Sequence, residues 1–389
     1  MLAGAGSDSD RCGQTGRVLH LATTWMTPDM DDDTDDDTDD DTGAIDDDMF
    51  RFDPPQLDVD EALRIARDRW GIDGVGRRLP GERSFNTWIE TPSGRRFVLK
   101  IQSAGEDPAT IDLHARALVH VERRAPHLPV ARMLPTSDGE LVPGVSIGGR
   151  IHPARMVTYL PGHDFDGADA VSERGLRAIG ALIGALAAAL SDFEHPAAGG
   201  FMAWDLANGL AVDPAMRDSI GPESIRVLEQ ADDRLHRAVD LMPSLPHQVI
   251  HNDGHAGNLL RPHPGSDEVC GVIDFGDVVH TIRVADVAIA GESFAPTADD
   301  PAGALARITA GYHAHHRLTS REIAAIPDLV LVRMALTIVL LEHQIVAVPH
   351  LATRAERHLP HVVRATERWL GLDPDRLVER IEAAMDDES

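Results

Sequence analysis

Two motifs constrain this chain more than any other feature. The first, His-Asn-Asp-Gly-His-Ala-Gly-Asn, covers residues 251–258, and the second, Asp-Phe-Gly-Asp, covers residues 274–277. They place the carboxylates of Asp253 and Asp274 and the amide of Asn258 on loops beside short apolar runs, which predict buried strands. Transfer of a nucleotide's terminal phosphate needs such groups. One carboxylate accepts the proton of the attacking hydroxyl, while an amide oxygen and a second carboxylate hold Mg²⁺.

A single lysine supports the same chemistry. Lys100 is the only lysine of the chain, and it lies in the run Phe-Val-Leu-Lys-Ile at 97–101, which predicts a strand. A compact ammonium that contacts nucleotide phosphates is not replaced by a planar guanidinium, so an arginine-rich sequence should keep lysine there. We therefore predict that Lys100 binds phosphates. Chance survival of a surface lysine is the alternative, and the apolar flanks argue against it.

The composition limits the partners and the compartment. The chain carries a net charge of −28, and although residues 29–48 hold 13 Asp, the remainder is also acidic. Acidic chains repel phosphate backbones, so we expect no nucleic-acid partner and a hydroxylated, cationic small molecule as substrate. Cys12 and Cys270 do not form a disulfide framework. The longest apolar helix we expect, near 176–190, is too short to span a membrane, and the N-terminus makes a poor signal peptide, which predicts a cytoplasmic protein without a membrane partner.

The order of patterns along the chain predicts three segments. Residues 1–56 are predicted to be a disordered acidic tail because of the Asp-Asp-Asp-Thr repeats. Residues 57–160 alternate in strand-like fashion and contain Lys100, which indicates a small β-rich, nucleotide-binding domain. Residues 161–389 show apolar positions three and four apart in six long stretches, which indicates a larger helical domain with the two motif loops.

Together these residues resemble the aminoglycoside phosphotransferase and choline kinase superfamily, and within it the hydroxylysine kinase branch. The resemblance covers roughly residues 57–385. It is carried by Leu-Pro-Gly-Glu-Arg-Ser-Phe-Asn at 79–86, Trp-Asp-Leu at 204–206, and Gly-Tyr, Leu-Thr-x-x-Glu and Arg between Gly311 and Arg333. It implies an α+β, bilobal protein-kinase-like fold. It also implies phosphorylation of a small hydroxyl compound with Mg²⁺ and ATP or GTP.

The resemblance assigns roles to the motif residues. Asp253 becomes the catalytic base, His251 a structural partner of its loop, Asn258 and Asp274 the metal ligands, and Lys100 the phosphate contact. Four residues of the nucleotide loop would cover the nucleotide: Gly81, Glu82, Arg83 and Ser84. Three consecutive residues would offer backbone groups to the purine: Thr158, Tyr159 and Leu160.

Two positions depart from the superfamily pattern. The usual loop reads His-Gly-Asp, whereas this chain has Asn252, a residue that tolerates unusual backbone angles. The superfamily usually offers a glutamate to the lysine from the N-lobe helix that follows the lysine strand. Here that helix offers Asp112, His114 and Glu122, and none is a clear match. These departures keep open a non-catalytic binding module, a pseudokinase.

The same residues also allow other interpretations. A protein kinase would want arginine at 252 and an Ala-Pro-Glu element, and both are missing. An aminoglycoside phosphotransferase remains an alternative because the C-terminus, 385–389, is acidic. Asp277 could assist the metal or hold the substrate cation, or it could simply cap a loop or be solvated, and Asp286 could anchor a loop. Acids that could meet a substrate amine, although simple solvation is the plainer interpretation, are Asp164, Asp166 and Glu292.

We therefore predict a kinase for a hydroxylated amino acid or amino alcohol, with 5-hydroxylysine as the named substrate. His313, His315 and His316 invite a zinc site, but their spacing on one helix does not direct three imidazoles at one ion. The oligomeric state cannot be predicted from these patterns.

Overall fold

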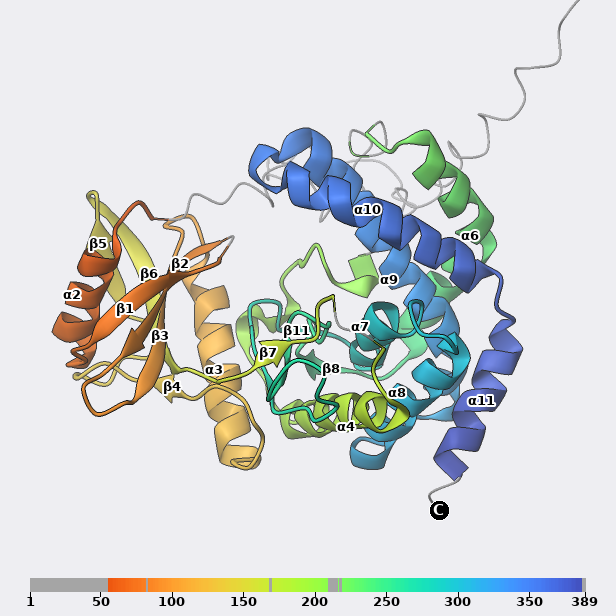
Figure 1. Cartoon of the computed structure of the whole chain (residues 1–389), viewed down its shortest axis with the longest axis horizontal. Helices are drawn as coiled ribbons and strands as arrows, with labels where there is room; N and C mark the ends of the chain where they lie inside the picture. Colours follow the sequence, from red (N-terminus) through yellow and green to blue (C-terminus); the bar gives the residue numbers. More distant parts are fainter. Residues whose placement is uncertain (1–54, 82, 168–169, 209–215, 217–218, 387–389) are drawn as a thin grey trace, which may run out of the picture.

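The computed structural model describes residues 55–81, 83–167, 170–208, 216 and 219–386. Most of the predicted acidic tail therefore lies outside the described residues. The described chain has a sheet-rich N-terminal part and a helical C-terminal part, which lie side by side in Figure 1. We call the part from α2 to β6 the N-lobe and the part from α4 onward the C-lobe. The α+β bilobal architecture predicted from the sequence is confirmed.

The N-lobe is built on a six-stranded antiparallel sheet. Its main path is β1-β2-β3-β6-β4, and β5 pairs with β6. The strands are β1 Val75–Leu79, β2 Ser84–Glu90, β3 Arg96–Gln102, β4 Met133–Leu134, β5 Gly144–Ile147 and β6 Arg150–Thr158. Strand β6 is continuous through Pro153. It pairs with β5 up to Pro153 and with β3 from Ala154, so the missing N–H of proline falls where the strand changes partner.

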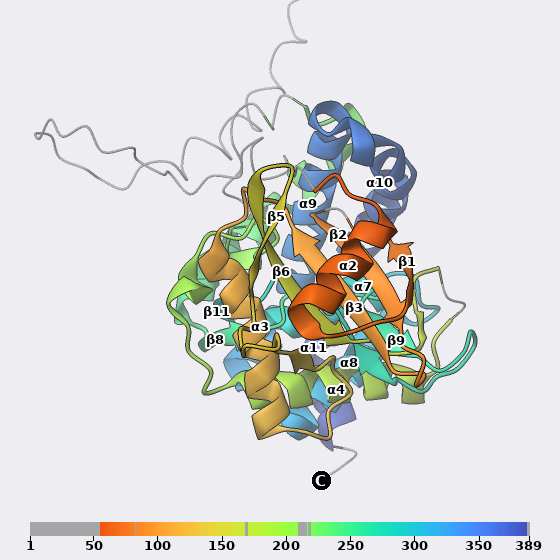
Figure 2. The same ribbon diagram turned by 90° about the vertical axis from the view of Figure 1, so that its left-hand side faces the viewer.

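Two helices flank this sheet. Helix α2 (Val59–Trp70) is capped by Asp58, whose carboxylate accepts the N–H of Glu61. It packs Ala62 and Ala66 with the buried side chains of β2 and β3, and Figure 2 shows it crossing the outer face of the sheet. Helix α3 (Pro108–Arg124) lies between the sheet and the C-lobe in Figure 1. It therefore brings its side chains to the meeting point of the lobes.

The C-lobe consists mainly of long helices. They are α4 Glu173–Leu190, α6 Pro222–Leu241, α7 Ala285–Phe294, α8 Pro301–His315, α9 Ser320–Ala347, α10 Pro349–Leu370 and α11 Pro374–Asp386. Helices α4 and α8 approach so closely that glycine is needed at the contact. A Cβ atom at Gly180 would lie 1.9 Å from the carbonyl oxygen of Ile308, and one at Gly311 would lie 2.2 Å from that of Arg177. Gly311, part of the family-like motif, thus serves packing.

Helix α9 is the central helix of the C-lobe. We expected the longest apolar helix near 176–190, and that expectation is wrong. Among the described residues, α9 alone is long and apolar enough to cross a membrane, but 89% of its apolar window is buried. The other helices cover α9 on its sides, so its hydrophobicity reflects its position in the core.

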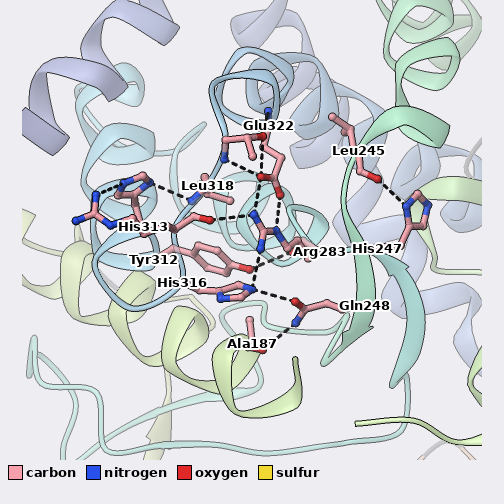
Figure 3. Close-up of polar contacts among 12 residues, drawn as sticks. Ala187, Leu245, His247, Gln248, Arg283, Tyr312, His313, His316, Leu318 and Glu322 are labelled. Atoms are coloured by element: carbon pink, nitrogen blue, oxygen red, sulfur yellow. Dashed lines mark hydrogen bonds and ion pairs between the residues drawn. The ribbon is translucent and has the colours of Figure 1, made fainter. Parts of the chain in front are cut away.

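An ion pair fixes the start of α9. Arg283 contacts the two carboxylate oxygens of Glu322 at 2.7 and 2.8 Å, and Glu322 also completes a capping box with Thr319. The hydroxyl of Tyr312 donates to the carbonyl oxygen of Arg283 at 3.2 Å, as Figure 3 shows. The motif residues Tyr312, Thr319 and Glu322 therefore hold the C-lobe together.

Short strand pairs carry the two motif loops. Strand β8 (His247–Ile250) pairs with β11 (Val279–Ile282), and β9 (Leu259–Arg261) pairs with β10 (Gly271–Val272) and with β7 (His163–Asp164). The first motif runs from β8 to β9, and the second lies between β10 and β11. The apolar runs beside the motifs are therefore strands, as predicted, and they hold both loops at the N-lobe side of the helices.

Candidate active site

The first motif loop joins Asp253 to Asn258. The amide nitrogen of Asn258 donates to the Asp253 carboxylate at 2.5 Å and to its backbone carbonyl at 3.0 Å. Within the described residues the amide oxygen of Asn258 makes no hydrogen bond. With this assignment of the amide, the nitrogen orients the carboxylate and the oxygen is open to a cation.

An unusual backbone conformation shapes this loop. Asn252 has a φ of 62°, a left-handed conformation that asparagine adopts more readily than most residues. Its N–H donates to the buried carboxylate of Asp286 at 2.9 Å. Next to it, the N–H of Asp253 donates to Nδ1 of His251 at 3.3 Å. The interpretation of Asp286 as a loop anchor is thus supported by a direct contact, and asparagine at 252 is compatible with the turn.

The second motif loop brings Asp274 to Lys100. Nζ of Lys100 lies 3.1 Å from Oδ1 of Asp274, although 174 residues separate them in the chain. Lys100 is 18% exposed in its side chain and Asp274 is 47% exposed. The ammonium of Lys100 holds the pKa of the Asp274 carboxyl well below its usual range, so this carboxylate is charged at neutral pH.

The helix that should offer a glutamate to Lys100 offers a histidine. His114 on α3 is buried, and neither ring nitrogen has a hydrogen-bond partner within the described residues. Burial, and then the charge of Arg155, lower its pKa, so it is neutral. Arg155 is also buried and lies directly opposite Lys100 in the pairing of β3 with β6. Lys100 therefore pairs with Asp274, and Arg155 adds a second cation that motif reasoning missed.

The predicted nucleotide loop forms the turn between β1 and β2. A Cβ atom on Gly81 would lie 2.4 Å from the amide nitrogen of Asn86, which itself donates to the carbonyl of Pro80 at 2.9 Å. Nη1 of Arg83 lies 3.6 Å from Asp277 and thereby links this turn to the second motif loop. Ser84 is buried, and its hydroxyl donates to Asn86 at 2.8 Å. Glu82 lies outside the described residues.

The segment from Thr158 to Leu160 connects the lobes. The N–H of Thr158 donates to the carbonyl of Arg132 at 2.9 Å, and that of Tyr159 donates to the carbonyl of Arg96 at 3.0 Å. The N–H of Leu160 has no partner among the residues that the structure describes. Of the three residues predicted to face the purine, Leu160 is therefore the one with a backbone donor to offer.

The pKa values of the carboxyl groups in the two loops are shifted in opposite directions. Burial, and then the neighbouring charge of Asp277, raise the pKa of Asp253 well above its usual range, whereas Lys100 lowers that of Asp274. One group is thus tuned to accept a proton and the other to remain an anion. Burial lowers the pKa of His251 to about 4 and that of His255 to about 4, so both imidazoles are neutral near pH 7.

The histidines near the end of α8 do not form a metal site. His313 accepts the N–H of Leu318 at 3.2 Å, while Nε2 of His316 contacts Gln248 at 2.9 Å (Figure 3). No group of three metal-ligating side chains of the His, Cys, Asp or Glu type occurs in the described part of the chain. The geometric argument against zinc is consistent with these contacts.

A strand lysine paired with an Asp-Phe-Gly aspartate, beside an aspartate and asparagine in one loop, defines the class of phosphotransferases with a kinase-like fold. Residues 75–322 match the sequence profile of the phosphotransferase enzyme family, and the chain belongs to this family. It is similar to hydroxylysine kinase of Mus musculus, with 27% identity over 63% of this chain and 69% of that protein. It is also similar to homoserine kinase of Methylobacillus flagellatus, with 30% identity over 64% of this chain and 73% of that protein.

A solved structure supports the fold. An amicoumacin kinase in complex with AMP-PNP, Ca²⁺ and Ami superposes with a TM-score of 0.62 at 16% identity, covering 82% of this chain and 97% of that one. The chain is thus a small-molecule kinase that transfers phosphate to a hydroxyl group, as the sequence motifs predicted.

Proposed function

We propose that this kinase phosphorylates a hydroxylated amino acid or amino alcohol, with 5-hydroxylysine as the preferred candidate. The observation that carries the proposal is the meeting of Lys100 with Asp274 beside the Asp253–Asn258 pair. Similarity to enzymes named hydroxylysine kinase and homoserine kinase supports the substrate class. Both names describe amino acids with a primary or secondary hydroxyl.

The oxygen ligands fit Mg²⁺. Asp274 contributes a charged, partly exposed carboxylate and Asn258 an unpaired amide oxygen. Magnesium in kinases is held by one or two protein oxygens together with nucleotide phosphates, so a cage of three or more side chains is not needed. When bound, the ion neutralises charge on the phosphates. The Ca²⁺ and AMP-PNP of the amicoumacin kinase complex support a divalent cation and a nucleotide here.

We propose that Asp253 accepts the proton of the attacking hydroxyl. Its carboxylate is held by the amide nitrogen of Asn258, and its raised pKa favours proton uptake compared with an ordinary aspartate. When a nucleotide is bound, Lys100 would contact its phosphates, and part of the Asp274 carboxylate would then be free to hold the metal ion. Arg155, opposite Lys100 in the sheet, would add a second positive charge. Leu160 would donate its N–H to the purine. This backbone contact does not distinguish ATP from GTP, and either nucleotide is proposed as the phosphate donor.

Two alternative functions follow from other features of the sequence. An aminoglycoside phosphotransferase was suggested by the acidic C-terminus, but residues 387–389 lie outside the described residues, and α11 packs against α8 and α9. A pseudokinase was suggested by Asn252 and the missing helix glutamate; Asn252 fits its turn, and Lys100 has Asp274 as its counter-ion. A cytoplasmic location and the absence of nucleic-acid and membrane partners stay predictions.

A substrate panel tests the proposal. Nucleotide-diphosphate release is measured with ATP or GTP, Mg²⁺, and equimolar 5-hydroxylysine, homoserine, amino alcohols or aminoglycosides. We expect turnover with the amino-acid or amino-alcohol members and its loss in Asp253→Asn, which keeps the size of the side chain. The exposed Asp240→Asn is the matched control. Turnover only with aminoglycosides would replace the substrate class, and binding of Mg²⁺-nucleotide without any turnover would favour the pseudokinase.

A further inference from the structure

Arg333 is a buried cation in the apolar helix α9. Its side chain is 5% exposed, its guanidinium lies 4.9 Å from the ring centroid of Trp204, and Nη1 donates to the carbonyl of Trp204 at 2.8 Å. Its Nε is buried without a hydrogen-bond partner among the described residues, and the carbonyl of Trp204 is the acceptor that its guanidinium contacts. A buried charge is costly unless hydrogen-bond acceptors surround it, so this guanidinium is suited to an anionic ligand.

Trp204 and Arg333 are tied to the first motif loop. The neighbouring carboxylate of Asp205 accepts the hydroxyl of Thr281 at 2.8 Å. Thr281 lies in β11, which pairs with β8, the strand that leads into the loop. The guanidinium is therefore connected, through Trp204 and Asp205, to the strand pair that leads into the loop of Asp253.

An acid on the adjacent helix completes a pair of opposite charges. Glu292 lies on α7, which packs against α9. The next residue, Ser293, accepts the N–H of Ala256 at 2.9 Å, and this bond fastens α7 to the first motif loop. Burial raises the pKa of Glu292 and Arg333 lowers it, yet the two side chains do not form a direct ion pair. Both charges therefore remain able to bind a ligand that carries both signs.

Resting on the proposed function, we propose that Arg333 binds the carboxylate of an amino-acid substrate and that Glu292 binds its ammonium group. A guanidinium matches a carboxylate with two parallel hydrogen bonds, and Trp204 holds its plane fixed. An amino alcohol lacks the carboxylate and would leave Arg333 unpaired. A polycationic aminoglycoside would be repelled by Arg333. The site therefore selects hydroxylated amino acids among hydroxylated amines.

Matched substrates test this assignment. Each pair consists of an amino acid and its decarboxylated counterpart: 5-hydroxylysine with 1,5-diaminopentan-2-ol, and homoserine with 3-aminopropan-1-ol. Nucleotide-diphosphate release gives kcat and KM for all four compounds. Loss of a charge-assisted hydrogen bond to a carboxylate weakens binding by about 10- to 100-fold. We therefore expect the wild-type enzyme to prefer at least one amino acid over its counterpart by about that factor in kcat/KM.

Three variants isolate the guanidinium. Arg333→Met should raise KM for the amino acid by about 10- to 100-fold with little change in kcat, while the values for the amino alcohol change less than about threefold. Arg333→Lys keeps the charge without the fork and should recover part of the preference; it also serves if the methionine variant fails to fold. The control Arg321→Met removes an exposed arginine from the same helix and should change neither substrate.

Two failures are distinguishable. If the wild-type enzyme turns over none of the four compounds, the proposed function itself is overturned. If it turns over the amino alcohols as well as the amino acids, or if the Arg333 variants lower both members of a pair equally, the role of Arg333 is structural and the carboxylate assignment is wrong. A drop confined to the amino acid supports the assignment, because a general loss of structure would affect both members alike.

Discussion

The carboxyl group that anchors the first motif loop should impose a pH dependence on folding. Asp286 is fully buried, and burial raises its pKa from 3.8 to about 7, opposed by hydrogen bonds from the backbone of Asn252 and His251. Between pH 4 and 7 the folded state therefore keeps a proton that the unfolded state has lost. The free energy of unfolding then falls as the pH rises through this window, and the loss is nearly complete about one pH unit above the folded-state pKa.

The magnitude follows from the two pKa values. A rise from 3.8 to about 7 corresponds to at most about 4 kcal/mol, because each pKa unit is worth about 1.4 kcal/mol. In Asp286→Asn the amide oxygen can still accept the N–H of Asn252, but the side chain cannot ionise. Because part of this range lies outside the interval from pH 4.5 to 7.5, the stability of the variant relative to the wild type should increase by about 3 kcal/mol across that interval.

Urea unfolding at several pH values measures this difference. His251 and His255, with pKa values lowered to about 4, have the opposite effect: they reduce the free energy of unfolding as the pH falls. Both histidines titrate in the variant as well as in the wild type, so their effect cancels in the comparison. The exposed Asp240→Asn should show no pH-dependent difference from the wild type. A difference between Asp286→Asn and the wild type that stays constant within about 0.5 kcal/mol over this range would refute the reasoning.

Three further changes have defined outcomes. Lys100→Arg should lower kcat/KM by about 10²- to 10³-fold while the melting temperature stays close to that of the wild type, since the planar fork cannot replace the ammonium; unchanged turnover would refute the lysine argument. Gly180→Ala should destabilise the C-lobe by about 1–3 kcal/mol, because its Cβ would meet a backbone carbonyl of α8, whereas Gly199→Ala, with open space around it, should be neutral in the same melting experiment. Glu322→Gln should cost about 3–5 kcal/mol by leaving Arg283 without its buried counter-ion, and a urea midpoint equal to that of the wild type would contradict this.

Local patterns predicted the elements and the loops of this protein. The spacing of Asp253, Asn258 and Asp274 between apolar runs located both motif loops, because strands that enter from the core leave polar residues at their ends. The lysine in an apolar run placed Lys100 in β3, since a charged residue in a strand needs a partner. Asn252 also fits the predicted loop, because asparagine tolerates the left-handed backbone conformation found there.

Contacts between distant segments could not be predicted in the same way. Arg155 lies opposite Lys100 because of the register of β3 with β6, and no local signal fixes that register. The buried hydroxyl of Ser84 turns toward Asn86 and away from solvent, which depends on the shape of the whole turn. Arg333 influences the pKa of Glu292 because α9 packs on α7, and no local pattern in the sequence predicts that packing.

Nucleotide binding measured by isothermal titration calorimetry tests the central arrangement most directly. AMP-PNP is titrated into the wild type, Asp253→Asn and Asp274→Asn, each with and without Mg²⁺. Wild type and Asp253→Asn should bind the nucleotide more tightly with Mg²⁺, because Asp274 and Asn258 remain to hold the ion, while Asp253→Asn is inactive in turnover. Asp274→Asn should lose the enhancement by Mg²⁺. An Asp274→Asn protein that binds Mg²⁺ and nucleotide like the wild type would contradict the site described above.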